Sequence, residues 1–153
     1  MYTYYLKALL VATIALFFSV VAFNNIVDYN TNWMFVKHVL SMDTIPQPSP
    51  LMGRAIHHHF LQQTLYIIII CWEAITAVIC WMGAYSLLNK KIKIANIGLM
   101  TGLMLYLLGF CIIASEWFAA WQSAQSGVQV TAYLFSTIIL LILIFINQPH
   151  KDS

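Results

Sequence analysis

Four long apolar stretches constrain the fold of this chain more than any other feature. They lie near residues 4–23, 64–87, 95–114 and 130–146. A helix needs about 20 mainly apolar residues to cross about 30 Å of hydrocarbon, and each stretch approaches that length. Hydrophobic residues make up 61% of the 153 residues and charged residues 8%, a composition far from that of soluble domains. We therefore predict an integral membrane protein with an all-α fold, a four-transmembrane-helix bundle in a single domain of residues 1–153.

The first stretch has a second interpretation. A lysine, an apolar run and small residues near the end of the run are also typical of a cleavable signal peptide. We expect the segment to be a retained spanning helix.

Basic residues predict the orientation, because they are kept preferentially on the cytoplasmic side of a membrane. Most of the lysines fall on one side of the expected bundle: Lys7, Lys90, Lys91, Lys93 and Lys151. Lys37 and Arg54 fall on the other. We expect both termini to be cytoplasmic, with an outer loop at residues 24–63. The cluster between the second and third stretches could also bind anionic lipid head groups.

Several classes of function are disfavoured by composition. The net charge of +2 gives no nucleic-acid footprint. The cysteines lie in the apolar stretches without a Cys-x-x-Cys pattern, which argues against a disulfide framework, a redox pair or covalent haem. The adjacent residues His57, His58 and His59 would point about 100° apart on a helix, so they make a poor metal site. We predict no metal and no firm cofactor, and an enzyme is the less favoured class.

The outer loop is longer than a passive connection usually is. Trp33, Val36, Val39 and Leu40 recur at helical spacing, and Asn30 or Thr31 could cap the helix. We predict a short amphipathic helix, lying in the membrane interface or packed as a lid over the bundle; the two can coexist. Three prolines in IPQPSP should end it. Ser49 before Pro50 then favours a second helix that begins near Pro50 and continues past the histidines.

Glu73 lies in the middle of the second apolar stretch, in YIIIICWEAITAVICW. A charged side chain at the bilayer centre costs about 2.5–3.5 kcal/mol on insertion scales, so it is by default a candidate functional residue. Residues three or four apart share one helix face. From Glu73 that spacing selects a face that we call the polar seam: His59, Gln62, Tyr66, Ile69, Thr76 and Cys80.

The polar seam should face away from lipid, and it has two interpretations. In the first, Glu73 is protonated or hydrogen-bonded to another helix and only fixes packing, including packing against another protein. In the second, the seam is a ligand path or proton path from the outer surface to the bilayer centre, formed by His59, Gln62, Tyr66, Glu73 and Thr76.

The third stretch carries a helix-packing pattern. Gly98 and Gly102 form a Gly-x-x-x-Gly motif, and Gly109 lies one heptad after Gly102. The same face would continue through Ile112 to Glu116, and Glu116 with Trp117 resembles an interfacial anchor.

Three motifs resemble a family of bacterial predicted small integral membrane proteins (domain of unknown function 2165): FNNIVDYNTNWMFVKHVLSMDT, WEAITA and SEWFAAWQS. The resemblance covers nearly the whole chain and implies four spans in the inner membrane, but no activity. Most matching polar residues fall on the outer side, where they would form an outer polar cap: Asn24, Asn25, Asp28, His38, Asp43, Arg54, Glu116, Trp117 and Gln122. The chain departs from the family pattern at AQSGVQVTAYLF, which lacks an arginine that could pair with Glu116.

Two functional hypotheses follow. The first is a non-enzymatic accessory or assembly subunit of a larger inner-membrane complex, with a respiratory complex as the candidate partner. The second is a protein that binds a quinone or lipid, or conducts protons, through the polar seam. A membrane-embedded hydrolase is the weakest hypothesis, because no serine or cysteine nucleophile has an evident base. Contacts are expected with membrane lipid and with other membrane subunits, and none with nucleic acid.

Overall fold

The fold is a bundle of four long helices with a smaller structured segment at one end, and it confirms the predicted all-α transmembrane class. The computed structural model describes residues 2–123 and 127–148, and these residues contain no strand. The elements, in chain order, are α1 (Tyr2–Val27), α2 (Tyr29–Ser41), a 3₁₀ turn (Met52–Arg54), α3 (His59–Leu88), α4 (Lys93–Met104), the π-helical segment η2 (Leu105–Trp117), a second 3₁₀ turn (Ala120–Gln122) and α5 (Val128–Asn147).

Within the described residues, four helices are long and apolar enough to cross a membrane: Thr3–Val27, His59–Leu88, Lys93–Trp117 and Gln129–Asn147. The third consists of α4 and η2 in succession. Each of the four ranges expected from the sequence lies inside one of these helices. The observed spans are longer at their ends, where polar residues continue the helix beyond the apolar run.

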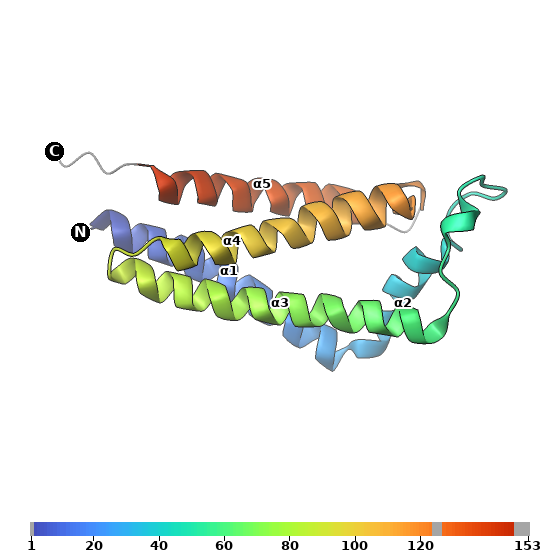
Figure 1. The fold of residues 1–153 in the computed structure, drawn as a ribbon, viewed down its shortest axis with the longest axis horizontal. Helices are drawn as coiled ribbons and strands as arrows, with labels where there is room; N and C mark the ends of the chain where they lie inside the picture. Colours follow the sequence, from blue (N-terminus) through green and yellow to red (C-terminus); the bar gives the residue numbers. More distant parts are fainter. Residues whose placement is uncertain (1, 124–126, 149–153) are drawn as a thin grey trace.

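The helices alternate in direction, so the start of α1, the α3–α4 link and the end of α5 lie at one end of the bundle (Figure 1). α2 and the loop after it lie at the other end, which we call the outer end. α1 packs most extensively against α3, α3 also packs against α4, and α5 packs against η2.

Small residues allow the close approach of α4 to its neighbours. A Cβ on Gly98 would lie 2.8 Å from Cys80 Sγ and 2.9 Å from the Cys80 backbone nitrogen. A Cβ on Gly102 would lie 2.7 Å from the Phe18 ring. Gly109 differs from the packing expectation, because a Cβ there would meet no other helix within 4 Å and would lie 3.5 Å from Leu105 in its own segment. Gly98 and Gly102 therefore lie at helix contacts, and Gly109 does not.

The predicted outer helix is present as α2, and it packs on the bundle as a lid. Trp33 and Leu40 are buried, and Leu40 joins a small apolar cluster with Met42, Ile45 and Phe118. The expected caps, Asn30 and Thr31, are wrong: both lie inside the helix, which begins at Tyr29 after Asp28. The chain continues almost directly from α1, so no loop precedes the helix.

The predicted start of the second spanning helix near Pro50 is also wrong. A single 3₁₀ turn follows Pro50, residues 55–58 are outside any helix, and α3 begins at His59. Two contacts hold this segment: the Ile56 amide donates to the Leu40 carbonyl at 2.8 Å, and the Gln62 side chain donates to the Ile56 carbonyl at 2.6 Å. His58 then caps α3, accepting from the Leu61 amide at 3.4 Å. The loop is thus fastened to α2 before the helix begins.

A buried lysine closes the other end of the bundle. Lys7 is 5% exposed, and its ammonium donates to the carbonyls of Ile146 at 2.8 Å and Gln148 at 3.1 Å. Carbonyls in the last turn of a helix have no intrahelical donor and carry the negative end of the helix dipole. Lys7 therefore joins α1 to the end of α5.

We expect Gly98→Ala to destabilise the bundle, by about 1–3 kcal/mol, because the new methyl group would overlap the backbone of Cys80. Unfolding in mild detergent would measure the change. Gly109→Ala is the matched control, since its methyl group has ordinary contact distances, and equal loss in the two variants would contradict the role of Gly98.

Lys7→Met should lower the midpoint of thermal unfolding, because it removes two hydrogen bonds from a charged donor, each contributing about 1.5–3 kcal/mol. Lys93→Gln, at an exposed lysine of the same end, is the control and should have little effect. An unchanged midpoint for Lys7→Met would show that the carbonyls of α5 are satisfied equally well by water.

Candidate functional site

Glu73 lies on the face of α3 that packs toward α1, and it is 3% exposed. Asn25, near the end of α1, donates from its side-chain Nδ2 to Glu73 Oε2 at 2.7 Å. Among the described residues no other donor reaches this carboxylate. One carboxylate oxygen is thus left for another partner.

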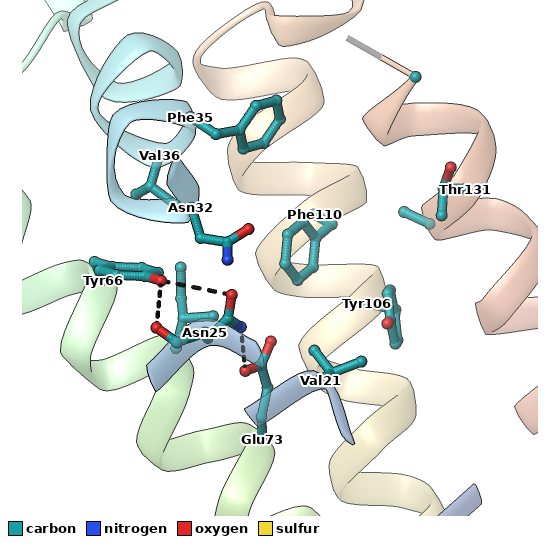
Figure 2. A pocket seen from close by; sticks show the side chains of 13 residues that line it. Val21, Asn25, Asn32, Phe35, Val36, Tyr66, Glu73, Tyr106, Phe110 and Thr131 are labelled. Carbon is teal, nitrogen blue, oxygen red and sulfur yellow. Dashed lines mark hydrogen bonds between the residues drawn. The ribbon is translucent and has the colours of Figure 1, made fainter. Parts of the chain in front are cut away.

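Tyr66, two turns before Glu73 on α3, fixes the orientation of Asn25. Its hydroxyl donates to the Asn25 backbone carbonyl at 3.0 Å and lies 3.5 Å from Asn25 Oδ1 (Figure 2). With Oδ1 turned toward Tyr66, the amide nitrogen of Asn25 faces Glu73. Tyr66 is itself 1% exposed and packs against the rings of Tyr29 and Trp33 from α2, with centroids 5.0 and 6.1 Å away. The lid helix α2 therefore holds Tyr66 in place, and Tyr66 in turn orients Asn25 toward Glu73.

These groups line a cavity of about 370 Å³. Side chains from α1, α2, α3, η2 and α5 surround it, as Figure 2 shows. Its polar lining consists of Asn25, Asn32, Tyr66, Glu73, Tyr106 and Thr131, and its apolar lining includes Val21, Phe35, Val36, Ile69 and Phe110. The cavity is large enough for a small organic group and has both hydrogen-bonding and apolar walls.

The charge of the cavity is unbalanced. Glu73 is its one ionisable carboxylate, and no lysine, arginine or histidine is among its described lining residues. Four rings, those of Phe35, Tyr66, Tyr106 and Phe110, face the same space. An ionised carboxylate in a low-dielectric site is costly without a positive or hydrogen-bonding partner. The site is therefore suited to a ligand that brings a donor or a positive charge.

The polar seam is only partly assembled as one path. Gln62, Tyr66, Glu73 and Thr76 are buried, whereas His59 is exposed and makes a T-shaped ring contact with Trp33. Gln62 donates to the loop carbonyl of Ile56 and makes no hydrogen bond to Tyr66. Thr76 Oγ1 has no partner among the described residues. Tyr66 and Glu73 are instead joined through Asn25 of α1.

The residues of the expected outer polar cap do not converge on one point. His38 Nδ1 lies 2.9 Å from the Asp43 carboxylate. Arg54 donates to the Trp117 carbonyl at 3.2 Å and stacks over its ring at 4.7 Å. Asn24 and Asp28 are exposed, and Gln122 is half-buried in a 3₁₀ turn. These residues form separate local contacts, and Asn25 belongs to the cavity.

Glu116 does have a partner in this chain. Gln129, at the start of α5, donates from Nε2 to Glu116 Oε1 at 3.2 Å. The side-chain amide of Gln129 is thus the partner of Glu116, in the absence of the arginine expected from the family pattern. Glu116 is exposed and does not line the cavity.

Sequence reasoning missed Asn32, Tyr106, Phe110 and Thr131 as cavity residues. Tyr106 is a hydroxyl-bearing residue inside an apolar stretch, and that signal could have placed it with Glu73. The contributions of α2 and α5 had no such signal, because they depend on how the lid and the last helix pack. No three histidine, cysteine, aspartate or glutamate side chains gather as metal ligands in the described part of the chain.

Comparison with known proteins identifies the family. The model of the family described as predicted small integral membrane protein (DUF2165) matches residues 3–149. No match is found among curated proteins or among solved structures. Because the family model covers nearly the entire chain, this protein belongs to the DUF2165 family of predicted small integral membrane proteins.

Proposed function

We propose that this protein binds a small amphiphilic molecule from the membrane, in the cavity beside Glu73. The observation that carries the proposal is a buried carboxylate that receives one hydrogen bond and lies on the wall of a cavity of about 370 Å³. A residue that served packing alone would be surrounded by its partners. A ligand whose head group donates a hydrogen bond or carries positive charge would complete the coordination of Glu73.

The position of the cavity agrees with a ligand that arrives through lipid. Its lining residues come from the lid helix α2 and from the helices of the bundle. Its apolar walls suit a molecule already dissolved in the membrane, such as a lipid or a quinol. Binding and presentation of such a molecule need no nucleophile, so the proposal does not require an enzyme.

A second candidate is an accessory or assembly subunit of a larger inner-membrane complex, including a respiratory one. It is supported by large exposed apolar side chains near the outer end: Phe60 at 72%, Trp117 at 54% and Trp121 at 52% exposure. Aromatic residues of this kind are enriched at protein interfaces, but also at membrane–water interfaces. The cavity is specific to the first candidate, which we therefore prefer.

The orientation proposed is that of a bacterial inner-membrane protein with both termini in the cytoplasm. The end of the bundle with the start of α1 and the end of α5 carries Lys7, Lys90, Lys91 and Lys93, and the outer end carries Lys37 and Arg54. Lys151, also expected at the cytoplasmic end, lies outside the described residues. The excess of lysine favours that end for the cytoplasm.

Native mass spectrometry of the protein extracted gently from its membrane tests the ligand proposal. Wild type should carry a small molecule, and Glu73→Gln should lose about ten-fold or more in occupancy, because a hydrogen bond to a charged group contributes about 1.5–3 kcal/mol. The glutamine can still accept from Asn25, so the yield of folded protein should be unchanged.

Glu116→Gln is the matched control, because that carboxylate is exposed and away from the cavity. If Glu73→Gln fails to fold, Tyr106→Phe removes a cavity hydroxyl that bonds to no described residue, and it should also reduce occupancy. An empty wild-type protein that carries a second polypeptide would support the accessory-subunit candidate instead.

Cysteine labelling with a membrane-impermeant maleimide tests the orientation. Gly53→Cys, at an exposed site with no atom near its Cβ, should react in intact cells. Asn89→Cys, at the opposite end, should react only after permeabilisation. The reverse labelling pattern would contradict the proposed orientation. Labelling of the wild-type protein measures the background from the native cysteines.

A further inference from the structure

An apolar groove adjoins the cavity. It has a volume of about 190 Å³ and lies between α2, α3 and η2, and its described lining residues are all apolar apart from the indole of Trp72. Phe35, Val36, Ile69 and Phe110 line both the groove and the cavity. The cavity and the groove are therefore direct neighbours. The cavity has polar groups and a carboxyl group in its lining, and the groove is apolar.

The outer rim of the groove faces lipid. Ile68 of α3 and Ile113 of η2 line the groove, and each is 49% exposed on the outside of a spanning helix. A chain in the groove would therefore be continuous with the hydrocarbon of the membrane. A molecule could enter sideways while its head group reaches Glu73.

Gly109 keeps the groove open. It lines the groove, and a Cβ built on it meets no atom of another helix. We expect a larger side chain here to occupy groove space, because its Cβ is free of contacts with neighbouring helices. The position thus offers a way to fill the groove and leave the carboxylate intact.

The chemistry of the cavity lining bears on the head group. Glu73 is the one carboxyl group of the described lining, no basic side chain is part of that lining, and the rings of Tyr66, Tyr106, Phe35 and Phe110 line the same space. Aromatic faces attract cations, most strongly where water is excluded. A cationic head would stabilise the ionised form of Glu73, whereas an anionic head would be repelled by that form and a neutral hydroxyl would leave its charge uncompensated.

We propose that the ligand is a single-chain lipophilic cation, with its positively charged head beside Glu73 in the cavity and its apolar tail in the groove. This assignment rests on the proposed function and narrows it to one class of ligand. Glu73 provides charge, the aromatic rings provide cation–π contacts, and the groove admits one alkyl chain.

Three amphiphiles with the same twelve-carbon tail test the head group: dodecyltrimethylammonium, dodecanol and dodecanoate. Their binding would be measured by calorimetry on the full chain in nanodiscs of zwitterionic lipid, with empty nanodiscs subtracted. Wild type should bind the ammonium compound at least about ten-fold more tightly than the other two. Glu73→Gln should abolish this preference, and Glu116→Gln should keep it.

The tail is tested separately. Gly109→Leu should weaken binding of dodecyltrimethylammonium by about ten-fold, because the new side chain fills the groove. The affinity for butyltrimethylammonium, which has a short tail, should be the same in Gly109→Leu and wild type. This comparison keeps the head-group site unaltered. Equal binding of the long-chain cation to wild type and Gly109→Leu would overturn the placement of the tail.

The outcomes separate the two proposals. If dodecanol binds wild type as tightly as the cation and depends on Glu73, the ligand site stands and its assignment to a cation is overturned. Preference for dodecanoate also overturns it. If none of the three binds above empty nanodiscs, or if Glu73→Gln changes nothing, both the cation and the ligand site are overturned.

Discussion

The hydrogen bond between Asn25 and Glu73 links the two helices that pack most extensively in this protein, α1 and α3. Its position sets much of the outer half of the bundle. Tyr66 orients Asn25, α2 packs on Tyr66, and the loop after α2 is fastened to the start of α3 through Ile56 and Gln62. Polar groups in hydrocarbon must find partners within the protein, so this chain of contacts also fixes the rotation of α1 against α3.

The π-helical segment η2 gives the third span two different faces at the outer end. A π-helix closes its hydrogen bonds five residues back, as in the bond from the Phe118 amide to the Ile113 carbonyl. Side chains four apart then stay close to one face. Tyr106 and Phe110 line the cavity with ring centroids 5.5 Å apart, while Leu105, Gly109 and Ile113 line the groove. Such segments are frequent at functional sites, which agrees with the position of both hollows.

The sequence was sufficient to predict the four spans, because the need for about 20 apolar residues is a local property. It was also sufficient to single out Glu73, whose charge is costly in lipid wherever the neighbouring helices lie. The face predicted through Ile112 failed, since α-helical spacing does not apply in η2, and Ile112 is 53% exposed.

The partner of Glu73 could not be predicted in the same way. The sequence placed Asn25 in the outer polar cap and not beside Glu73, because the direction of its side chain depends on the packing of α1 on α3. The start of α3 depended on a contact between Ile56 and Leu40, which are far apart along the chain. Lys7 likewise meets α5 only after the bundle has closed.

Lys7 and Glu73 differ in how far the bundle itself satisfies a buried charged or ionisable side chain. Both are buried and both lie in spanning helices. The Lys7 ammonium is satisfied by two carbonyls at the end of α5, where the negative end of a helix dipole stabilises it.

The Glu73 carboxylate has one amide partner and faces a cavity with aromatic walls (Figure 2). Replacing a buried polar pair by well-packed apolar residues is often neutral or stabilising. The hydrogen bond to Asn25 fixes the rotation of α1 on α3, but that role does not account for the open space beside the carboxylate. The ligand that we propose would supply that reason, because it would provide the partner that the bundle itself does not.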